Sequence, residues 1–285
     1  MAERTVSERA FKEYLYERGI LARYEELPSG ITQPVDYSFE LAGQTIRFDV
    51  KEWKPPESIE PHLRVGSLDP YRPVRKKIEE GRKKFKQYKG RHEPCVLVLY
   101  PYGLQHIELN EIVIFGAMRG DLGWVFPINP DTGIGDTSRT EIKFTDGGKM
   151  IHQSPKATVR VQNTTISAVA VIKSIRVRSR WDSITLRRRE AAAGRKLTLE
   201  ETFELFPELY NADRSVEVEP CVVVYDNLDA AVPLPHGFPD GPYDERFGRC
   251  GNRLCRTYVG NELAAIESEE KEVGIRLDDP LSLRT

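Results

Sequence analysis

The chain has 285 residues, of which 39% are hydrophobic and 30% charged, a composition ordinary for a globular protein with a sizeable core. Its formal net charge of −2 excludes a polycation, so any binding of nucleic acid must depend on a local basic patch. Neither an apolar leader segment after Met1 nor a run of about 18 apolar residues is present, so we expect no membrane span and a cytoplasmic location with reduced thiols.

The first part of the chain predicts one helix followed by three strands. Residues 7–18 show helical spacing, with Phe11 and Leu15 on one face, and Gly19 is a suitable residue to end the helix. Strands are predicted over 20–27, 34–41 and 45–53. Short turns separate the strands, so we expect an antiparallel meander.

A very basic helix is predicted next, over residues 74–89. Between Tyr71 and His92, ten lysines and arginines face only two glutamates. The run CVLVLY at 95–100 follows and predicts a strand buried on both faces of a sheet. The basic helix then serves as the crossover to that strand, which gives the element order αβββαβ.

The second half of the sequence is less regular. Residues 111–118 and 123–128 look like strands, 166–172 and 221–225 like buried strands, and 233–242 like an ordered but irregular loop. Thr198 and Glu201 form a capping-box pattern that predicts a helix over 198–206. No linker divides the chain. We therefore predict a single α/β domain over 1–285, in which residues 5–100 form a core and 101–285 extend its mixed sheet and elaborate it.

The four cysteines fall into two classes. Cys95 and Cys221 lie in apolar runs and are predicted to be buried thiols. Cys250 and Cys255 stand five positions apart without a second pair or nearby histidines, which disfavours a zinc site.

A cluster of acids and one lysine carries the chemical signal of the sequence. Asp49 and Lys51 are two residues apart on one predicted strand, so they share a face, and a hairpin can bring Asp36 beside Asp49. Glu8 on the first helix could approach from above. Carboxylate oxygens suit Mg²⁺, which can polarise a phosphate oxygen and activate water, while the lysine ammonium stabilises developing negative charge.

The segment Val35-Asp36 followed by Asp49-Val50-Lys51 resembles the PD-(D/E)XK superfamily of restriction-endonuclease-like nucleases. The resemblance covers residues 5–100 and includes the αβββαβ order. One departure is the valine at position 35, where the superfamily name has proline. The resemblance implies a Mg²⁺-dependent or Mn²⁺-dependent nuclease with metal ligands at Asp36, Asp49 and the Val50 carbonyl, a catalytic lysine at Lys51, and a helical glutamate at Glu8.

Nucleic acid is the expected partner, with DNA favoured over RNA, and a homodimer would allow both strands to be cut. The excess positive charge of the second helix suits a phosphate backbone. The expected contact residues are Arg75, Lys83, Lys84, Lys86 and Gln87. Gln87 would match the glutamine that some members of the superfamily place on this helix, and Glu52 could also line the site. A second basic cluster at 173–196 includes Trp181, which could stack on a base.

Other interpretations stay open. Asp49 and Lys51 could form an ion pair on the solvated face of an edge strand, and Glu13 could replace Glu8. The chain could also be a module that has the nuclease fold and binds nucleic acid or a protein without turnover, or an unrelated α/β protein whose match to the motif is accidental.

Overall fold

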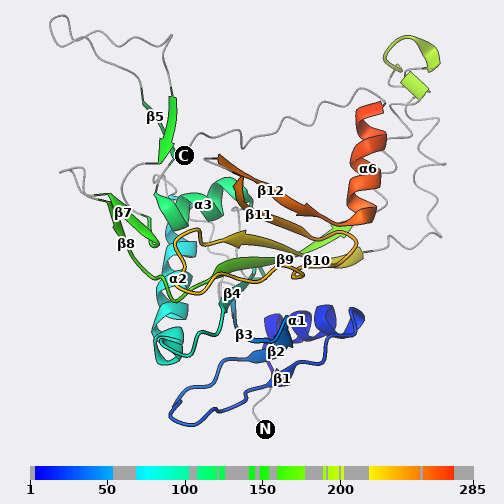
Figure 1. Cartoon of the computed structure of the whole chain (residues 1–285). Helices are drawn as coiled ribbons and strands as arrows, with labels where there is room; N and C mark the ends of the chain where they lie inside the picture. Colours follow the sequence, from blue (N-terminus) through cyan, green and yellow to red (C-terminus); the bar gives the residue numbers. More distant parts are fainter. Residues whose placement is uncertain are drawn as a thin grey trace, which may run out of the picture.

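The computed structural model describes residues 4–53, 69–102, 108–120, 122–125, 141–144, 148–153, 159–176, 189–190, 192–198, 200–201, 218–250 and 253–272. Their main feature is a mixed eight-stranded sheet with helices on both faces (Figure 1). The predicted α/β class is therefore confirmed.

The N-terminal elements follow the predicted order of one helix, three strands, a helix and a strand. The first three strands pair antiparallel, and β4 pairs in parallel with β3 after the helical crossover. The predicted strand at 20–27 shortens to two residues. The elements are α1 (Val6–Glu17), β1 (Arg23–Tyr24), β2 (Tyr37–Leu41), β3 (Gln44–Glu52), α2 (Arg72–Phe85), the 3-10 turn η1 (Lys86–Tyr88) and β4 (Cys95–Tyr100).

Strands from the second half of the chain extend the same sheet, as predicted. The strand order is β1-β2-β3-β4-β9-β10-β11-β12. β9 is parallel to β4 and antiparallel to β10, and β11 is parallel to β10. The two pairs β5–β6 and β7–β8 form small separate sheets. The bounds are α3 (Glu111–Arg119), β5 (Leu122–Val125), β6 (Glu141–Phe144), β7 (Ile151–Gln153), β8 (Val159–Val161), β9 (Ala168–Arg176), β10 (Val218–Asp226), β11 (Glu245–Cys250), β12 (Arg253–Val259) and α6 (Asn261–Glu272).

The prediction of a strand at 111–118 is wrong, because this segment is the helix α3. The Asn110 side chain accepts a hydrogen bond from the Val113 N–H and caps the helix, and Gly120 at a φ of 130° ends it. Nearly every side of α3 is buried, so its sequence lacks the polar face that reveals a helix. A short apolar run alone does not separate a buried helix from a buried strand.

Other predictions for the second half have mixed outcomes. Thr198 and Glu201 do exchange the hydrogen bonds of a capping box, but most of the predicted helix 198–206 lies outside the described residues. Trp181 and its arginine neighbours also lie outside them. The loop 233–242 has neither helix nor strand, as predicted. Arg246 secures it by donating to the carbonyls of Leu234, Pro235 and Phe238.

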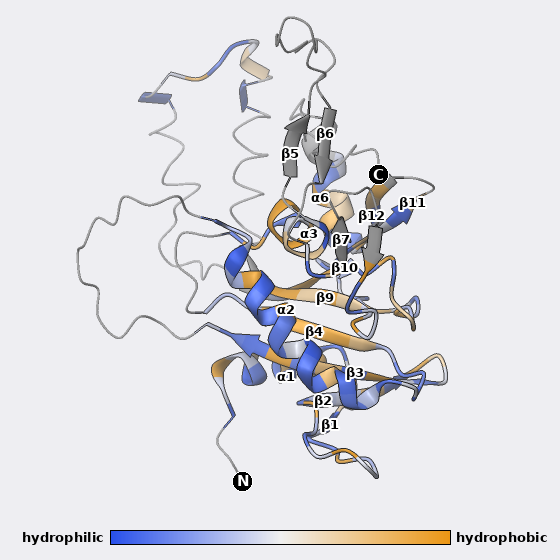
Figure 2. Cartoon of the chain, turned by 90° about the vertical axis from the view of Figure 1, so that its left-hand side faces the viewer, coloured by the Kyte–Doolittle hydropathy of each residue, from blue (hydrophilic) through white to orange (hydrophobic). Residues whose placement is uncertain are grey.

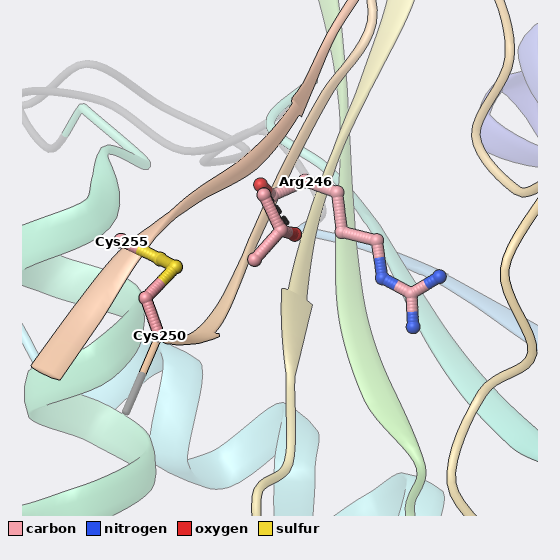
Figure 3. Close-up of a disulfide and its surroundings, with 4 residues drawn as sticks. Arg246, Cys250 and Cys255 are labelled. Carbon is pink, nitrogen blue, oxygen red and sulfur yellow. Dashed lines mark hydrogen bonds between the residues drawn. A yellow bond between two sulfur atoms is a disulfide. The ribbon is translucent and has the colours of Figure 1, made fainter. Parts of the chain in front are cut away.

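The cysteines differ in part from expectation. Cys95 and Cys221 are buried free thiols, as predicted. Cys250 and Cys255 form a disulfide that links β11 to β12, so the expectation of reduced thiols fails for this pair. In Figure 3 the Arg246 side chain extends away from the disulfide, toward the loop it holds. No helix of the described segments combines the length and the apolar character that crossing a membrane would need.

Alternation along the central strands divides the core into two layers. In β4, Leu97 and Leu99 pack with the layer of α2 and α3, whereas Val96 and Val98 pack with α1 on the opposite face. Figure 2 shows the mostly hydrophilic helix α2 over the more hydrophobic strands β4 and β9. A strand buried on both faces favours a nearly continuous apolar run, which explains the sequence CVLVLY.

β3 shows the same alternation, but one of its faces is apolar and the other is polar. Ile46, Phe48 and Val50 join the α1 layer. The intervening residues Arg47, Asp49 and Lys51 therefore face α2. Arg47 and Asp49 of this row are buried, because α2 covers this face of β3, whereas Lys51 at its end is partly exposed.

Close packing brings α2 over this polar row. Val74, Ile78 and Phe85 are fully buried and line the inner face of the helix. At Gly81, between the last two of them, a Cβ would lie 2.9 Å from Leu97 Cδ1 on β4. The absence of a side chain at Gly81 thus allows the helix to approach the sheet closely.

Replacing Ile78 with Ala should lower the free energy of unfolding by about 2–5 kcal/mol, because it leaves a cavity between α2 and β4. Urea denaturation followed by circular dichroism measures the change. The matched control is Lys83→Ala on the exposed face of α2, which should stay within about 0.5 kcal/mol of the parent. Equal losses in both variants would contradict the packing described.

Candidate functional site

The hairpin of β2 and β3 places Asp36 opposite Asp49. Tyr37 pairs with Phe48 in the antiparallel register, and the Asp36 N–H donates to the Phe48 carbonyl. One step further along the same register brings Asp36 and Asp49 face to face. Asp36 Oδ2 also accepts a 2.6 Å hydrogen bond from the Val50 N–H, which fixes the carboxylate against β3. The predicted meeting of the two acids is confirmed.

Two lysines neutralise the negative charge of these acids. Lys51 Nζ lies 3.1 Å from Asp49 Oδ1 and 3.0 Å from Oδ2. Lys84 Nζ, from α2, lies 2.8 Å from Asp36 Oδ1 and 2.6 Å from Asp49 Oδ1. Two carboxylates and two ammonium groups therefore form one balanced cluster. Asp49 itself is completely buried.

The interpretation of Asp49 and Lys51 as a solvated pair on an edge strand is wrong. β3 has hydrogen-bonded neighbours on both sides, and Asp49 has no exposed surface. A buried carboxylate without partners would carry a large desolvation penalty. The lysines are thus a requirement for keeping Asp49 charged inside the fold.

Burial and charge act in opposite directions on these groups. Burial raises the pKa of the Asp49 carboxyl, and the ammonium of Lys51 opposes the rise while the nearby Asp36 adds to it. For Lys84, burial alone would lower the pKa, but the carboxylates of Asp49 and Asp36 outweigh burial and raise the pKa above its ordinary value. Lys84 therefore stays protonated and acts as a fixed cation.

A cavity of about 510 Å³ opens beside the cluster, between the start of α1, the end of β3 and α2. Asp36 and Lys51 reach its wall, whereas Asp49 is not among its lining residues. Its lining mixes acids and cations: Thr5, Ser7, Glu8, Asp36, Val50, Lys51, Glu52, Trp53, Lys76 and Lys77. The space is large enough for an ion, its waters and a phosphate group.

Glu8 and Glu52 line this cavity but already have structural partners. Glu8 Oε2 accepts from the Thr5 N–H at 3.0 Å and completes the capping box of α1. Glu52 Oε2 accepts from the Ser7 N–H at 2.8 Å. The alternative to Glu8, Glu13, is exposed and lines a separate surface groove on α1. Glu8 is therefore better placed than Glu13.

The chain gave no match to a family model, a curated protein or a solved structure. The likeness to the PD-(D/E)XK superfamily thus rests on the motif and the element order alone. The geometry of the acids and lysines must carry any functional assignment.

Not every residue expected on the nucleic-acid surface lies there. Lys83 on α2 and Lys86 at the start of η1 are exposed, as such a role requires. Arg75 instead packs over the Tyr71 ring and donates to the Gly116 carbonyl of α3. Gln87 Oε1 accepts from the Thr32 N–H and hydroxyl and ties down a loop away from the cavity. The expectations for Arg75 and Gln87 therefore do not match their contacts.

Lys84 is the main correction to the expected surface, because its ammonium points into the acid pair. Lys76 and Lys77, which were not predicted as site residues, also line the cavity. Helical spacing in the sequence could have predicted that Lys77 and Lys84 share one side of the helix, because they lie two turns apart on one flank of the buried stripe.

The described residues contain no group of three or more histidines, cysteines, aspartates or glutamates placed to hold a metal ion. The acids that converge are a pair, and the expected third carboxylate, Glu8, is held at its helix cap. Two carboxylates remain a sufficient protein contribution for Mg²⁺, which keeps several of its waters.

The role of Asp36 in holding β3 gives a testable difference between two variants. Asp36→Ala leaves the buried Val50 N–H without its acceptor and should lower the unfolding free energy by about 1–3 kcal/mol. Asp36→Asn keeps an acceptor oxygen and should lose less. Urea denaturation in EDTA compares them. Identical stabilities for the two variants would show that this hydrogen bond is not maintained.

Proposed function

We propose that this protein is a metal-dependent nuclease that hydrolyses phosphodiester bonds of nucleic acid. The observation that supports it best is the convergence of the Asp36 and Asp49 carboxylates on one cationic position beside an open cavity. The motif and element order of the PD-(D/E)XK superfamily favour the same reaction and favour DNA as substrate. That the core belongs to that superfamily is part of this proposal.

The two acids fit a divalent cation. The Lys84 ammonium lies within 2.8 Å of an oxygen from each acid, so a single point close to both carboxylates exists. The Asp49 Oδ2 atom lies 3.0 Å from the Lys51 ammonium but accepts no hydrogen bond from the described residues, so a cation could share it. Hard oxygen donors of this kind suit Mg²⁺ or Mn²⁺. Bound there, the cation would polarise a phosphate oxygen and lower the pKa of a water.

The protein's own residues would position the phosphate and provide positive charge around it. Lys51 reaches both Asp49 and the cavity wall, so its ammonium can face the phosphate and stabilise the negative charge that grows during attack. Lys76 and Lys77 line the same cavity and can hold neighbouring phosphates. Asp36, fixed to the Val50 N–H, keeps its second oxygen aimed at the metal position.

Exposed lysines next to Lys84 extend this charge outward. Lys83 lies on α2, the helix that delivers Lys84 to the acids, and Lys86 begins the adjoining turn η1. A phosphate backbone crossing α2 would therefore pass close to the cavity. Release of counterions from such a backbone provides the affinity that the net charge of the chain does not.

A binding module without turnover is the second candidate. One observation favours it: the ammonium groups of Lys51 and Lys84 balance the charges of Asp36 and Asp49. A cluster of this kind can be purely structural. The assay below separates the two functions.

Wild-type protein with Mg²⁺ or Mn²⁺ should cleave plasmid or single-stranded DNA, or RNA, and EDTA should abolish cleavage. Asp49→Asn and Lys51→Ala should each lower the cleavage rate by about 10²-fold or more, because each removes a group that acts on the reacting phosphate. Gel assays under single-turnover conditions measure the rate.

The control for this assay is Glu262→Gln, an exposed position on α6. It should cleave at the wild-type rate. Binding of nucleic acid without any metal-dependent cleavage by the wild type would favour the binding module. Cleavage that survives both site substitutions would remove the proposed mechanism.

Charge reversal on α2 tests the proposed path of the backbone. Lys83→Glu with Lys86→Glu should weaken DNA binding and reduce the slope of log affinity against log salt by about one for each phosphate that is no longer neutralised. Fluorescence anisotropy at several salt concentrations measures both. The matched control is Arg9→Glu with Lys12→Glu, two exposed positions on α1 across the sheet. Equal weakening by both double variants would mean that α2 is not the contact surface.

A further inference from the structure

Lys84 differs from its neighbours on the basic helix. Lys83 and Lys86 are exposed, whereas the Lys84 side chain is only 18% exposed and its ammonium contacts two carboxylates. The stripe of Val74, Ile78 and Phe85 fixes the rotation of α2 and thereby directs Lys84 inward. Its position is therefore a consequence of helix packing, and not of a mobile surface side chain.

The ammonium of Lys84 and a divalent cation would need the same space. Lys84 Nζ lies 2.8 Å from Asp36 Oδ1 and 2.6 Å from Asp49 Oδ1. A metal ion bound by these two oxygens would lie between them, where the ammonium now lies. Two positive groups cannot share that position, because their mutual repulsion adds to the steric conflict.

Lys51 does not create the same conflict. Within the described part of the chain it pairs with Asp49 and not with Asp36, and it already reaches the cavity wall. Asp49, in contrast, has no exposed surface and is absent from the cavity lining. Binding of a cation between the two acids thus requires movement of Lys84, whereas Lys51 can remain in place.

We propose that Lys84 is a built-in counter-ion that occupies the metal position of the metal-free protein and must be displaced when a divalent cation binds. The inference rests on the proposed function. In this role Lys84 is a positioning residue that lowers metal affinity and keeps the two buried acids neutralised. Once displaced, its ammonium stays tethered to α2 beside the cavity, where a phosphate can neutralise it. Metal and nucleic acid therefore bind with positive coupling.

Titration of the full chain with MnCl₂ by isothermal calorimetry tests the competition. Lys84→Met should bind Mn²⁺ at least about tenfold more tightly than wild type, because a unit charge at contact distance has been removed. Lys83→Met, a matched change one position away on the exposed face, should bind Mn²⁺ as the wild type does. Equal or weaker Mn²⁺ binding by Lys84→Met would overturn the inference.

If Lys84→Met does not fold, lysine footprinting of the wild-type protein provides a second test of the competition between Lys84 and the metal. An amine-acylating reagent and mass spectrometry report the reactivity of each lysine with and without saturating Mn²⁺. Lys84 should be protected in the metal-free protein and become reactive with Mn²⁺, while Lys83 stays unchanged. Unchanged protection of Lys84 at full Mn²⁺ occupancy would contradict displacement.

The outcomes also separate this inference from the proposed function. If wild type and Lys84→Met both bind Mn²⁺ with one affinity, the counter-ion role fails and the nuclease proposal stands. If neither binds Mn²⁺, both fail together. Asp49→Asn identifies the site, because it should abolish the tight binding seen in the Lys84→Met background.

Discussion

The buried charge of Asp49 is the constraint on which the site depends. β3 runs in the middle of the sheet, so one face must be apolar toward α1, and any charge on the other face must find partners under α2. Asp49 meets this requirement through Lys51 on its own strand and Lys84 on the crossover helix. Removing one member of such a cluster leaves a charge without its partner inside the fold, so the cluster ties helix and hairpin together.

The sequence predicts the N-terminal half of this arrangement well, because strong local signals govern it. Strict alternation marks β3, the all-apolar run marks β4, and a hairpin register suffices to bring Asp36 to Asp49. The segment of α3 instead predicts a strand, because it is buried on nearly every side and has no polar face. The disulfide between Cys250 and Cys255 depends on the β11–β12 register, which spacing alone does not reveal.

The sequence predicts the acids of the site but not its second lysine. Asp36, Asp49 and Lys51 meet as the motif suggests, whereas Lys84 lies within a long basic run that favours a surface position. Charge alone cannot distinguish an inward lysine from its exposed neighbours. The phase of the helix decides it, and that phase is set by three-dimensional packing of its apolar stripe against the sheet. The same phase turns Arg75 toward α3.

The central claim is that Asp36 and Asp49 together form one divalent-cation position. A crystal soaked in MnCl₂, with diffraction recorded for anomalous differences, tests this most directly. The account predicts a peak at about 2.1 Å from an oxygen of each acid, with the Lys84 ammonium moved out of that position. A crystal that shows Lys84 still bridging the acids, with Mn²⁺ absent or bound elsewhere, would contradict it.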